Sequence, residues 1–323
     1  MKLKIGVLGA GHLGRIHLRC ISEVPEYDLV GFFDTDTTTS ARIASEYGIA
    51  AFDSVSSLLA VVDVVDIVTP TPTHYALAAQ AIRAGKHVFI EKPITHTLAE
   101  AASLISLAKQ YDVKVQVGHV ERFNPAILAL NGISLDPMFV ESHRLSMFNP
   151  RGTDVPVVHD LMIHDIDLLL SMVKSEVVDV RASGVAVVSN THDIANARIE
   201  FANGCVANLT ASRISLKQMR KMRLFQRDAY VSIDFLEKQA QVIRIFAEDD
   251  PDLPTDANLL PLDTPTGRRL IQINMPEVQP VNAIKMELEA LAESILHKLP
   301  VRVSAEAGLR ALRVAEQIVA AIS

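Results

Sequence analysis

The chain of 323 residues has no tryptophan, only two cysteines, and fewer basic than acidic side chains. Cys20 and Cys205 are far apart, so the sequence offers neither a disulfide framework nor closely spaced cysteine metal ligands, which fits a reducing compartment. The formal net charge of −7 argues against a general affinity for nucleic acid, because phosphate-binding proteins usually carry a basic surface.

Long apolar runs are also missing. The most apolar stretch, residues 58–68, is interrupted by Asp63 and Asp66 and is too short to cross a bilayer. The first strand-like run follows Met1 almost directly, with no apolar signal region before it. We therefore expect a cytoplasmic protein that binds neither membrane nor nucleic acid.

The sequence is rich in apolar residues, which make up 49% of a chain too long for one hydrophobic core. Up to residue 122, apolar runs typical of buried strands alternate with helical patterns, as in a doubly wound parallel sheet. Beyond Arg122 the pattern predicts a helix from Val158 to about Met172 and then longer, alternating strands between residues 177 and 247. Two domains of different architecture follow from this change.

The second half also contains recognisable turns and helices. Asn203-Gly204 predicts a two-residue hairpin turn, because both residues accept positive φ angles. Helical patterns return at residues 283–296 and 306–322, whereas the proline- and acid-rich residues 248–265 indicate a surface loop. The second domain is therefore expected to be α+β with a largely antiparallel sheet.

A glycine-rich turn joins the apolar strand at residues 5–8 to the first helical pattern. Its sequence is Gly9-Ala10-Gly11-His12-Leu13-Gly14. Gly9 would make the tight turn, Gly11 would let backbone approach a pyrophosphate, and Gly14 would let the helix pack on the strand. An ordinary glycine-rich turn is the alternative, but the strand, the helix and a correctly spaced acid favour a dinucleotide site.

That acid is Asp34, which ends the next apolar run 20 residues after Gly14. Its carboxylate would accept hydrogen bonds from the adenosine ribose hydroxyls and repel a 2′-phosphate, so NAD is expected and NADP is disfavoured. The fold class predicted is α/β, with an N-terminal Rossmann dinucleotide-binding domain at residues 1–122. Residues 123–323 are expected to form an α+β domain for substrate binding and oligomerisation.

Two segments follow strands whose carboxyl ends should face the cofactor. One is Thr69-Pro70-Thr71-Pro72-Thr73-His74, which could wall the nicotinamide side or be a stiff surface turn. The other is Glu91-Lys92-Pro93, where the Lys92 ammonium could meet a substrate hydroxyl or simply pair with Glu91 or reach water.

The helix near residue 164 carries titratable side chains on an otherwise apolar segment. At 100° per residue, His164 lies about 40° to one side of Asp160 and Asp167 about 20° to its other side, while His159 and Asp165 point elsewhere. An Asp one turn from a His can orient the imidazole as a general base. The stripe could also be a solvated helix edge; a metal site is not expected, since no further His or Cys cluster completes a ligand set.

A basic segment stands out in the acidic chain. Six cations fall within fifteen residues: Arg213, Lys217, Arg220, Lys221, Arg223 and Arg227. They could hold a diphosphate or form solvated strand faces that protect a sheet edge.

These motifs together resemble the Gfo/Idh/MocA family of oxidoreductases over essentially the whole chain. The resemblance implies NAD(P)-dependent oxidation or reduction of a secondary hydroxyl on a sugar, nucleotide sugar or cyclitol. It implies that the residues matching Lys92 and His164 act at that hydroxyl, supported by the one matching Asp160, and that the protein is a homodimer or homotetramer. Contacts to the cofactor would come from the following residues: Gly9, Gly11, His12, Leu13, Gly14, Asp34, Thr69, Pro70, Thr71, His74, Glu91 and Lys92. Contacts to the substrate would come from Lys92, Arg122, Asn124, Arg151, Asp160, His164 and Arg213.

Within the family, residues 118–125, 148–155 and 160–165 are similar to a branch that oxidises the 3-hydroxyl of UDP-N-acetylglucosamine. The basic segment would suit a nucleotide-sugar diphosphate. Three other functions are alternatives: a cyclitol dehydrogenase, a non-catalytic dinucleotide-binding regulator of a protein partner, and a dimerising structural protein. Because Lys92, Asp160 and His164 are all present, the sequence favours an enzyme.

Overall fold

The computed structural model describes residues 2–149, 155–251, 253–254, 259–265 and 267–322. Contacts divide the chain into two units, Met1–Phe123 with Asn282–Arg313, and Asn124–Val281 with Val314–Ser323. Residues 282–313, which the sequence pattern places after the second sheet, therefore pack with the first unit. No helix within the described ranges is long and apolar enough to cross a membrane.

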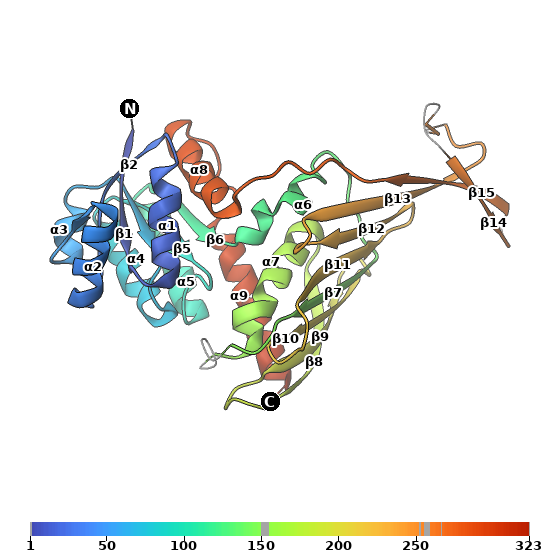
Figure 1. The fold of residues 1–323 in the computed structure, drawn as a ribbon. Coiled ribbons are helices and arrows are strands. Elements are labelled where there is room, and N and C mark those ends of the chain that lie inside the picture. The colour runs from blue at the N-terminus through green and yellow to red at the C-terminus, as the bar shows by residue number, and fades with distance from the viewer. Residues whose placement is uncertain (1, 150–154, 252, 255–258, 266, 323) are drawn as a thin grey trace. The chain divides into compact units, whose positions relative to one another are not determined.

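A six-stranded parallel sheet forms the centre of the first unit (Figure 1). Its strands are β1 (Leu3–Leu8), β2 (Tyr27–Phe33), β3 (Ala50–Ala51), β4 (Val64–Ile67), β5 (His87–Glu91) and β6 (Val115–Gly118). The order β3-β2-β1-β4-β5-β6 is that of a dinucleotide-binding Rossmann fold, in which ligands bind beyond the carboxyl ends of β1 and β4. The predicted doubly wound fold is confirmed.

Helices cover both faces of this sheet. They are α1 (His12–Ser22), α2 (Thr37–Tyr47), α3 (Val55–Leu59), α4 (His74–Arg83), α5 (Leu98–Gln110), α8 (Ala283–Leu296) and the start of α9 (Ala305–Ile322). Neighbouring strand residues project into two separate apolar clusters, with Val7 in one and Leu8 in the other. Leu288 and Leu291 of α8 belong to the same cluster as Leu18 of α1, which explains why α8 packs with the first unit.

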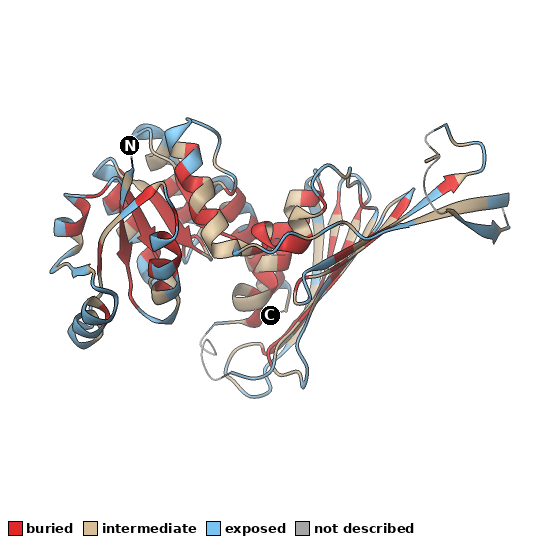
Figure 2. Cartoon of the chain, turned by 45° about the horizontal axis from the view of Figure 1, so that its top comes forward, coloured by how far each residue is buried: buried red, intermediate tan, exposed pale blue. Residues whose placement is uncertain are grey.

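The second unit contains a sheet of nine strands. The sheet is largely antiparallel, as predicted. Its strands are β7 (Phe139–Leu145), β8 (Val177–Val185), β9 (Ile194–Phe201), β10 (Val206–Ser212), β11 (Met219–Phe225), β12 (Ala229–Asp234), β13 (Gln239–Ala247), β14 (Leu259–Thr264) and β15 (Gly267–Asn274). The order is β14-β15-β13-β12-β11-β7-β10-β9-β8, and the β7–β10 pair is parallel. Buried residues alternate with partly exposed ones along β12, so one face is covered and the other is open (Figure 2).

The covered face packs against α6 (Pro125–Leu128), a π-helical turn (Val158–Met162) and α7 (Ile163–Met172). Three local predictions are wrong. The hairpin at Asn203-Gly204 has a loop of three residues between Phe201 and Cys205, not the predicted two, and Gly204 alone in this loop has a positive φ. Residues 259–264 form β14 rather than loop, because they pair along β15, and the helix near residue 160 begins with a π-turn.

A buried ion pair joins α7 to the sheet. Arg144 Nε of β7 lies 2.7 Å from Asp165 Oδ2, and both side chains are only 3% exposed. The Ser142 hydroxyl also donates to Asp165 Oδ1 at 3.0 Å. This ion pair, together with apolar packing, fixes the side of α7 that carries Asp165 against the sheet.

Removing one partner would leave the other charge buried without compensation. We expect Asp165→Ala to lower the free energy of unfolding by about 3–5 kcal/mol, measured by urea denaturation. Asp179→Ala is the matched control, because Asp179 pairs with Arg181 at the surface and should change stability by less than about 1 kcal/mol. Equal effects of the two substitutions would contradict this role of Asp165.

Candidate active site

The glycine-rich turn has a backbone that only glycine tolerates at two positions. Gly9 has φ +95°, and a Cβ there would lie 2.8 Å from the Val68 carbonyl oxygen. A Cβ on Gly14 would overlap the Gly9 carbonyl oxygen, so this glycine lets α1 approach the turn, as expected. A Cβ on Gly11 would meet nothing within 4 Å, which leaves open space beside the backbone there.

The start of α1 is suited to an anion. Gly11 is the N-cap and makes no side-chain cap hydrogen bond, and the first turn carries no acidic residue. His12 is exposed and Leu13 half-buried in this turn. The N–H groups of the first turn and the helix dipole together favour a phosphate at this end.

Asp34 lies directly after β2 and closes the other side of the turn. Its Oδ2 accepts a hydrogen bond from Ala10 N at 2.6 Å, and its Oδ1 accepts one from Asp36 N at 2.9 Å. A carboxylate has about four acceptor positions, so capacity remains for ribose hydroxyls. The neighbouring Asp36 caps α2 through Thr38 N and Thr39 N, and its negative charge adds to the barrier against a 2′-phosphate.

The segment after β4 forms a short 3₁₀-helix, Thr71–Thr73, that continues into α4. The ring of His74 is buried and bridges two backbone carbonyls, with Nε2 2.8 Å from Thr69 O and Nδ1 2.9 Å from Pro93 O. Burial lowers the pKa of His74, while the two carbonyl oxygens, which accept hydrogen bonds from the ring, act in the opposite direction. His74 therefore ties the Thr69–Pro70–Thr71 segment to the turn after β5 instead of reaching into solvent.

Lys92 follows β5 and is half-buried, and the Lys92–Pro93 peptide bond is cis. The preceding side chain, Glu91, is buried and holds the turn: its Oε2 accepts from Lys92 N at 3.1 Å. Because β4 and β5 are neighbouring parallel strands, Lys92 and Thr69 stand at the same edge of the sheet. That is the edge at which the glycine-rich turn also lies.

In the second unit, the two proposed catalytic groups follow one another on the π-turn and α7. Asp160 lies in the π-turn and His164 in the first turn of α7, and both are half-buried. Asp167, in contrast, is only 1% exposed. The predicted narrow stripe of three residues is therefore wrong in detail, because a π-turn does not advance 100° per residue and Asp167 lies in the core. His159 pairs with Glu316 of α9 at 2.9 Å.

The remaining predicted substrate residues differ in accessibility. Arg122 is half-buried in a 3₁₀-helix, Val120–Phe123. Asn124 caps α6 through Ala126 N and donates to Phe235 O, so its side chain also has a structural role. Arg213 is 4% exposed, contacts Asp193 and donates to the Val155 carbonyl. Arg151 lies outside the described residues.

Two exposed cations of the basic segment form ion pairs on the open face of the sheet. Lys221 lies 3.1 Å from Asp234, and Arg223 lies 3.7 Å from Glu141. A cavity of about 780 Å³ opens beside Lys221, and its lining contains none of the predicted site residues.

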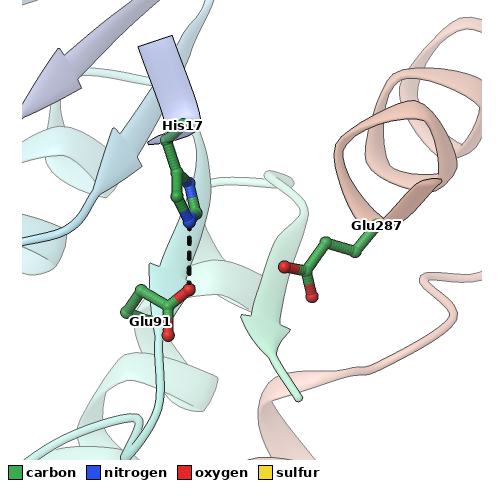
Figure 3. Close-up of side chains that lie close together, drawn as sticks. All are labelled: His17, Glu91 and Glu287. Carbon is green, nitrogen blue, oxygen red and sulfur yellow. Dashed lines mark ion pairs between the residues drawn. The ribbon is translucent and has the colours of Figure 1, made fainter. Parts of the chain in front are cut away.

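One cluster near Lys92 contains two residues, His17 and Glu287, that no sequence motif marks. His17 of α1, Glu91 of β5 and Glu287 of α8 offer ligand atoms within 4.8 Å of one another, all buried (Figure 3). Asp66 in the middle of the apolar strand β4 was the one available signal, because a carboxylate in a fully buried strand requires a partner. No local pattern distinguishes Glu287 from the surface acids of an amphipathic helix.

Comparison with known proteins agrees with this geometry. Residues 3–119 match the model for an oxidoreductase family with an NAD-binding Rossmann fold, and residues 137–229 match the GFO/IDH/MocA C-terminal domain. The chain is 39% identical over 321 residues to the UDP-N-acetylglucosamine 3-dehydrogenase of Acidithiobacillus ferrooxidans, covering 99% of this chain and 97% of that one.

Solved structures extend the likeness. A structure of the same Acidithiobacillus ferrooxidans enzyme has a TM-score of 0.88 and 37% identity, covering 100% of this chain and 98% of that one. Scyllo-inositol dehydrogenase from Lactobacillus casei, with bound NAD(H) and scyllo-inositol, has a TM-score of 0.78 at 23% identity and covers 99% and 97%; it supports the fold. The predicted family and the NAD-binding domain are confirmed.

Asp34 provides a direct test of cofactor choice. We expect wild-type protein to bind NAD more tightly than NADP. Asp34→Ala should weaken NAD binding roughly 10- to 100-fold, because charge-assisted hydrogen bonds to the ribose are lost. The substitution should also reduce the preference for NAD over NADP. Asp28→Ala, an exposed position on the same strand, should leave both dissociation constants unchanged. Tighter binding of NADP by the wild type would refute the role of Asp34.

Proposed function

Because the chain belongs to the Gfo/Idh/MocA oxidoreductase family, we propose that it is an NAD-dependent dehydrogenase that oxidises the 3-hydroxyl of UDP-N-acetylglucosamine. The observation that carries this proposal is the placement of Lys92 at the sheet edge that bears the glycine-rich turn, in a chain 39% identical to a UDP-N-acetylglucosamine 3-dehydrogenase over nearly its full length. An inositol 2-dehydrogenase of Rhizobium meliloti is less similar, at 27% identity over 66% of this chain.

Oxidation of a secondary alcohol removes a hydride from carbon and a proton from oxygen. Bound NAD supplies the hydride acceptor, held by the N-terminus of α1 and by Asp34. Lys92 donates a hydrogen bond to the substrate hydroxyl oxygen and fixes its position. His164 accepts the hydroxyl proton, with Asp160 supporting the imidazole. In the reverse direction His164 returns the proton.

Other residues expected from the resemblance would supply the remaining substrate contacts. Arg122, at the end of the first unit, is half-buried and has the charge to bind a diphosphate. Arg213 and Asn124 are held by their own neighbours, so we assign them to shaping the site around the sugar. Arg151 is proposed as a further substrate contact on the resemblance alone.

A dinucleotide-binding regulator remains the alternative from another class of protein. Such a protein would not need Lys92, Asp160 and His164 together. Since all three are present and two of them are half-buried on one segment, the enzyme is favoured.

Cys20 and Cys205 are both free and buried, which supports a reducing compartment such as the cytoplasm.

The activity can be measured as NAD reduction at 340 nm with UDP-N-acetylglucosamine, UDP-glucose, free hexoses and inositol as substrates. We expect Lys92→Ala to lower kcat by roughly 10²- to 10⁴-fold with little change in the Kd for NAD, because it removes a group that acts on the hydroxyl. His164→Ala should lower kcat and alter its pH dependence.

The matched control is His159→Ala, on the same helical segment but paired with Glu316, which should retain most turnover. Near-wild-type kcat in Lys92→Ala would overturn the catalytic assignment. Turnover of inositol but not of any UDP-sugar would overturn the proposed substrate.

We further propose a homodimer or homotetramer formed through the open face of the second sheet. Ile199 and Phe201 are buried in the core face, while Val185 is 56% exposed. The open face carries an apolar row across adjacent strands, whose members face each other in register: Phe139, Phe225, Tyr230, Ile243 and Ile273. Monomers rarely leave a contiguous apolar patch of this kind in water.

Sedimentation tests this proposal. Wild-type protein should sediment as a dimer or tetramer at micromolar concentration, and Phe225→Asp should shift it toward smaller species, because it places a charge in the row. Tyr111→Asp, at an exposed position of the first unit, should leave the oligomer intact. A wild-type monomer would contradict the proposal.

A further inference from the structure

Four titratable side chains are buried together in the first unit, next to Lys92: His17, Asp66, Glu91 and Glu287. His17 Nδ1 lies 2.9 Å from Asp66 Oδ2, and His17 Nε2 lies 3.2 Å from Glu91 Oε1. Glu287 points toward the His17–Glu91 pair from α8 (Figure 3). These side chains come from α1, β4, β5 and α8, so the cluster joins α1, which follows the glycine-rich turn, to the strand that ends directly before Lys92.

Glu287 is the unusual member. Its side chain is fully buried, and neither carboxylate oxygen has a hydrogen-bond partner among the described residues. Its backbone carbonyl is fixed separately, because it accepts a hydrogen bond from the Gln116 side chain of β6. An ionised carboxylate without a partner in such a place would be very costly, so the side chain must be neutral or hold a cation.

The charges of the cluster balance when Glu287 carries a proton. Burial opposes a charge on His17, but Asp66 and Glu91 outweigh it and raise the pKa of His17 well above its usual value. Burial also disfavours the Glu91 carboxylate, but His17 and Lys92 hold the pKa of Glu91 below its usual value.

Burial, together with the nearby Glu91 charge, raises the pKa of Glu287 well above its usual value. Two cations, His17 and Lys92, then face two anions, Asp66 and Glu91, beside one neutral acid. Burial also raises the pKa of Asp66, while the charge and hydrogen bond of His17 act in the opposite direction.

We propose that His17, Glu91 and Glu287 are positioning residues for Lys92. His17 lies on α1, the helix that follows the glycine-rich turn, and Glu91 links it to the backbone of Lys92. Glu91 is the centre of this link. One of its oxygens faces His17 and the other accepts the Lys92 N–H, so the Glu91 side chain fixes the first peptide of the turn. Glu287 fills the space beside Glu91 as a neutral carboxylic acid. The proposal builds on the assignment of Lys92 in the proposed function.

The test compares substitutions in the full-length protein by steady-state kinetics with NAD and UDP-N-acetylglucosamine. Glu91→Gln should lower kcat roughly 10- to 100-fold and shift its pH profile, with the Kd for NAD changed less than about threefold. Added to Lys92→Ala, it should have almost no further effect on kcat, because it acts through Lys92. Glu293→Gln, at an exposed position on the same helix as Glu287, is the control that should match wild type.

Glu287 is tested by rescue. Glu287→Ala should lower kcat about tenfold, and Glu287→Gln should restore most of it, because glutamine is neutral and of the same size. The sign of the pH effect follows from the raised pKa: the unfolded chain releases the Glu287 proton above about pH 4.5 while the folded chain keeps it, so wild-type stability falls as pH rises. Glu287→Gln should therefore have a higher Tm than wild type at pH 8, with the difference narrowing toward pH 5.

Three results would overturn the proposal. A full effect of Glu91→Gln in the Lys92→Ala background would show that Glu91 does not act through Lys92. Failure of glutamine to rescue Glu287→Ala would show that the acid is not neutral. Stoichiometric zinc or another divalent metal in purified wild type, lost in Glu287→Gln, would show that His17, Glu91 and Glu287 hold a cation and that Glu287 is not protonated.

Failure of the proposed function has a different signature. If wild type oxidises no UDP-sugar, crystal structures of the Glu91→Gln and Glu293→Gln proteins still test the positioning claim. The Lys92 backbone should be displaced in the first and unchanged in the second.

Discussion

Parallel pairing of β1 with β4, and of β4 with β5, is the constraint on which the rest of the first unit depends. Strands that run in one direction end at one edge, so three loops meet there: the glycine-rich turn, the segment after β4 and the turn at Lys92. Short polar contacts then lock the loops together. Asp34 binds the glycine-rich turn, and His74 bridges the other two loops. A cofactor bound at this edge would touch loops that are already held in place.

Buried charge is used in the same way in both units. Arg144 and Asp165 fix α7 to the second sheet, and His17, Asp66 and Glu91 fix α1 to β4 and β5. Such pairs contribute little net stability, because desolvation offsets their attraction, but removing one partner is strongly destabilising. Their value here is geometric: each holds a segment that carries a proposed catalytic residue, His164 in one case and Lys92 in the other.

Much of this could be predicted from the sequence, because the signals are local. The alternation of strands and helices predicts the first sheet, Gly9 to Gly14 with Asp34 predicts the dinucleotide site, and residues 283–296 are helical as expected. The π-turn before His164 could not be predicted, since helical periodicity assumes 100° per residue. The partner of α8 and the burial of Glu287 depend on contacts between segments some 200 residues apart, which no local pattern encodes. The sequence also could not place Ile199 and Phe201 on the covered face, because alternation does not say which face of a sheet is covered.

The central claim is that Lys92 of the first unit and His164 of the second act on one substrate hydroxyl. The most direct test is a crystal structure of the protein with NADH and UDP-N-acetylglucosamine bound. The account predicts the 3-hydroxyl oxygen within about 3.2 Å of Lys92 Nζ or a His164 ring nitrogen, with both side chains within about 7 Å of the nicotinamide C4. A complex in which His164 points into bulk solvent, or into the core of its own unit, would contradict it.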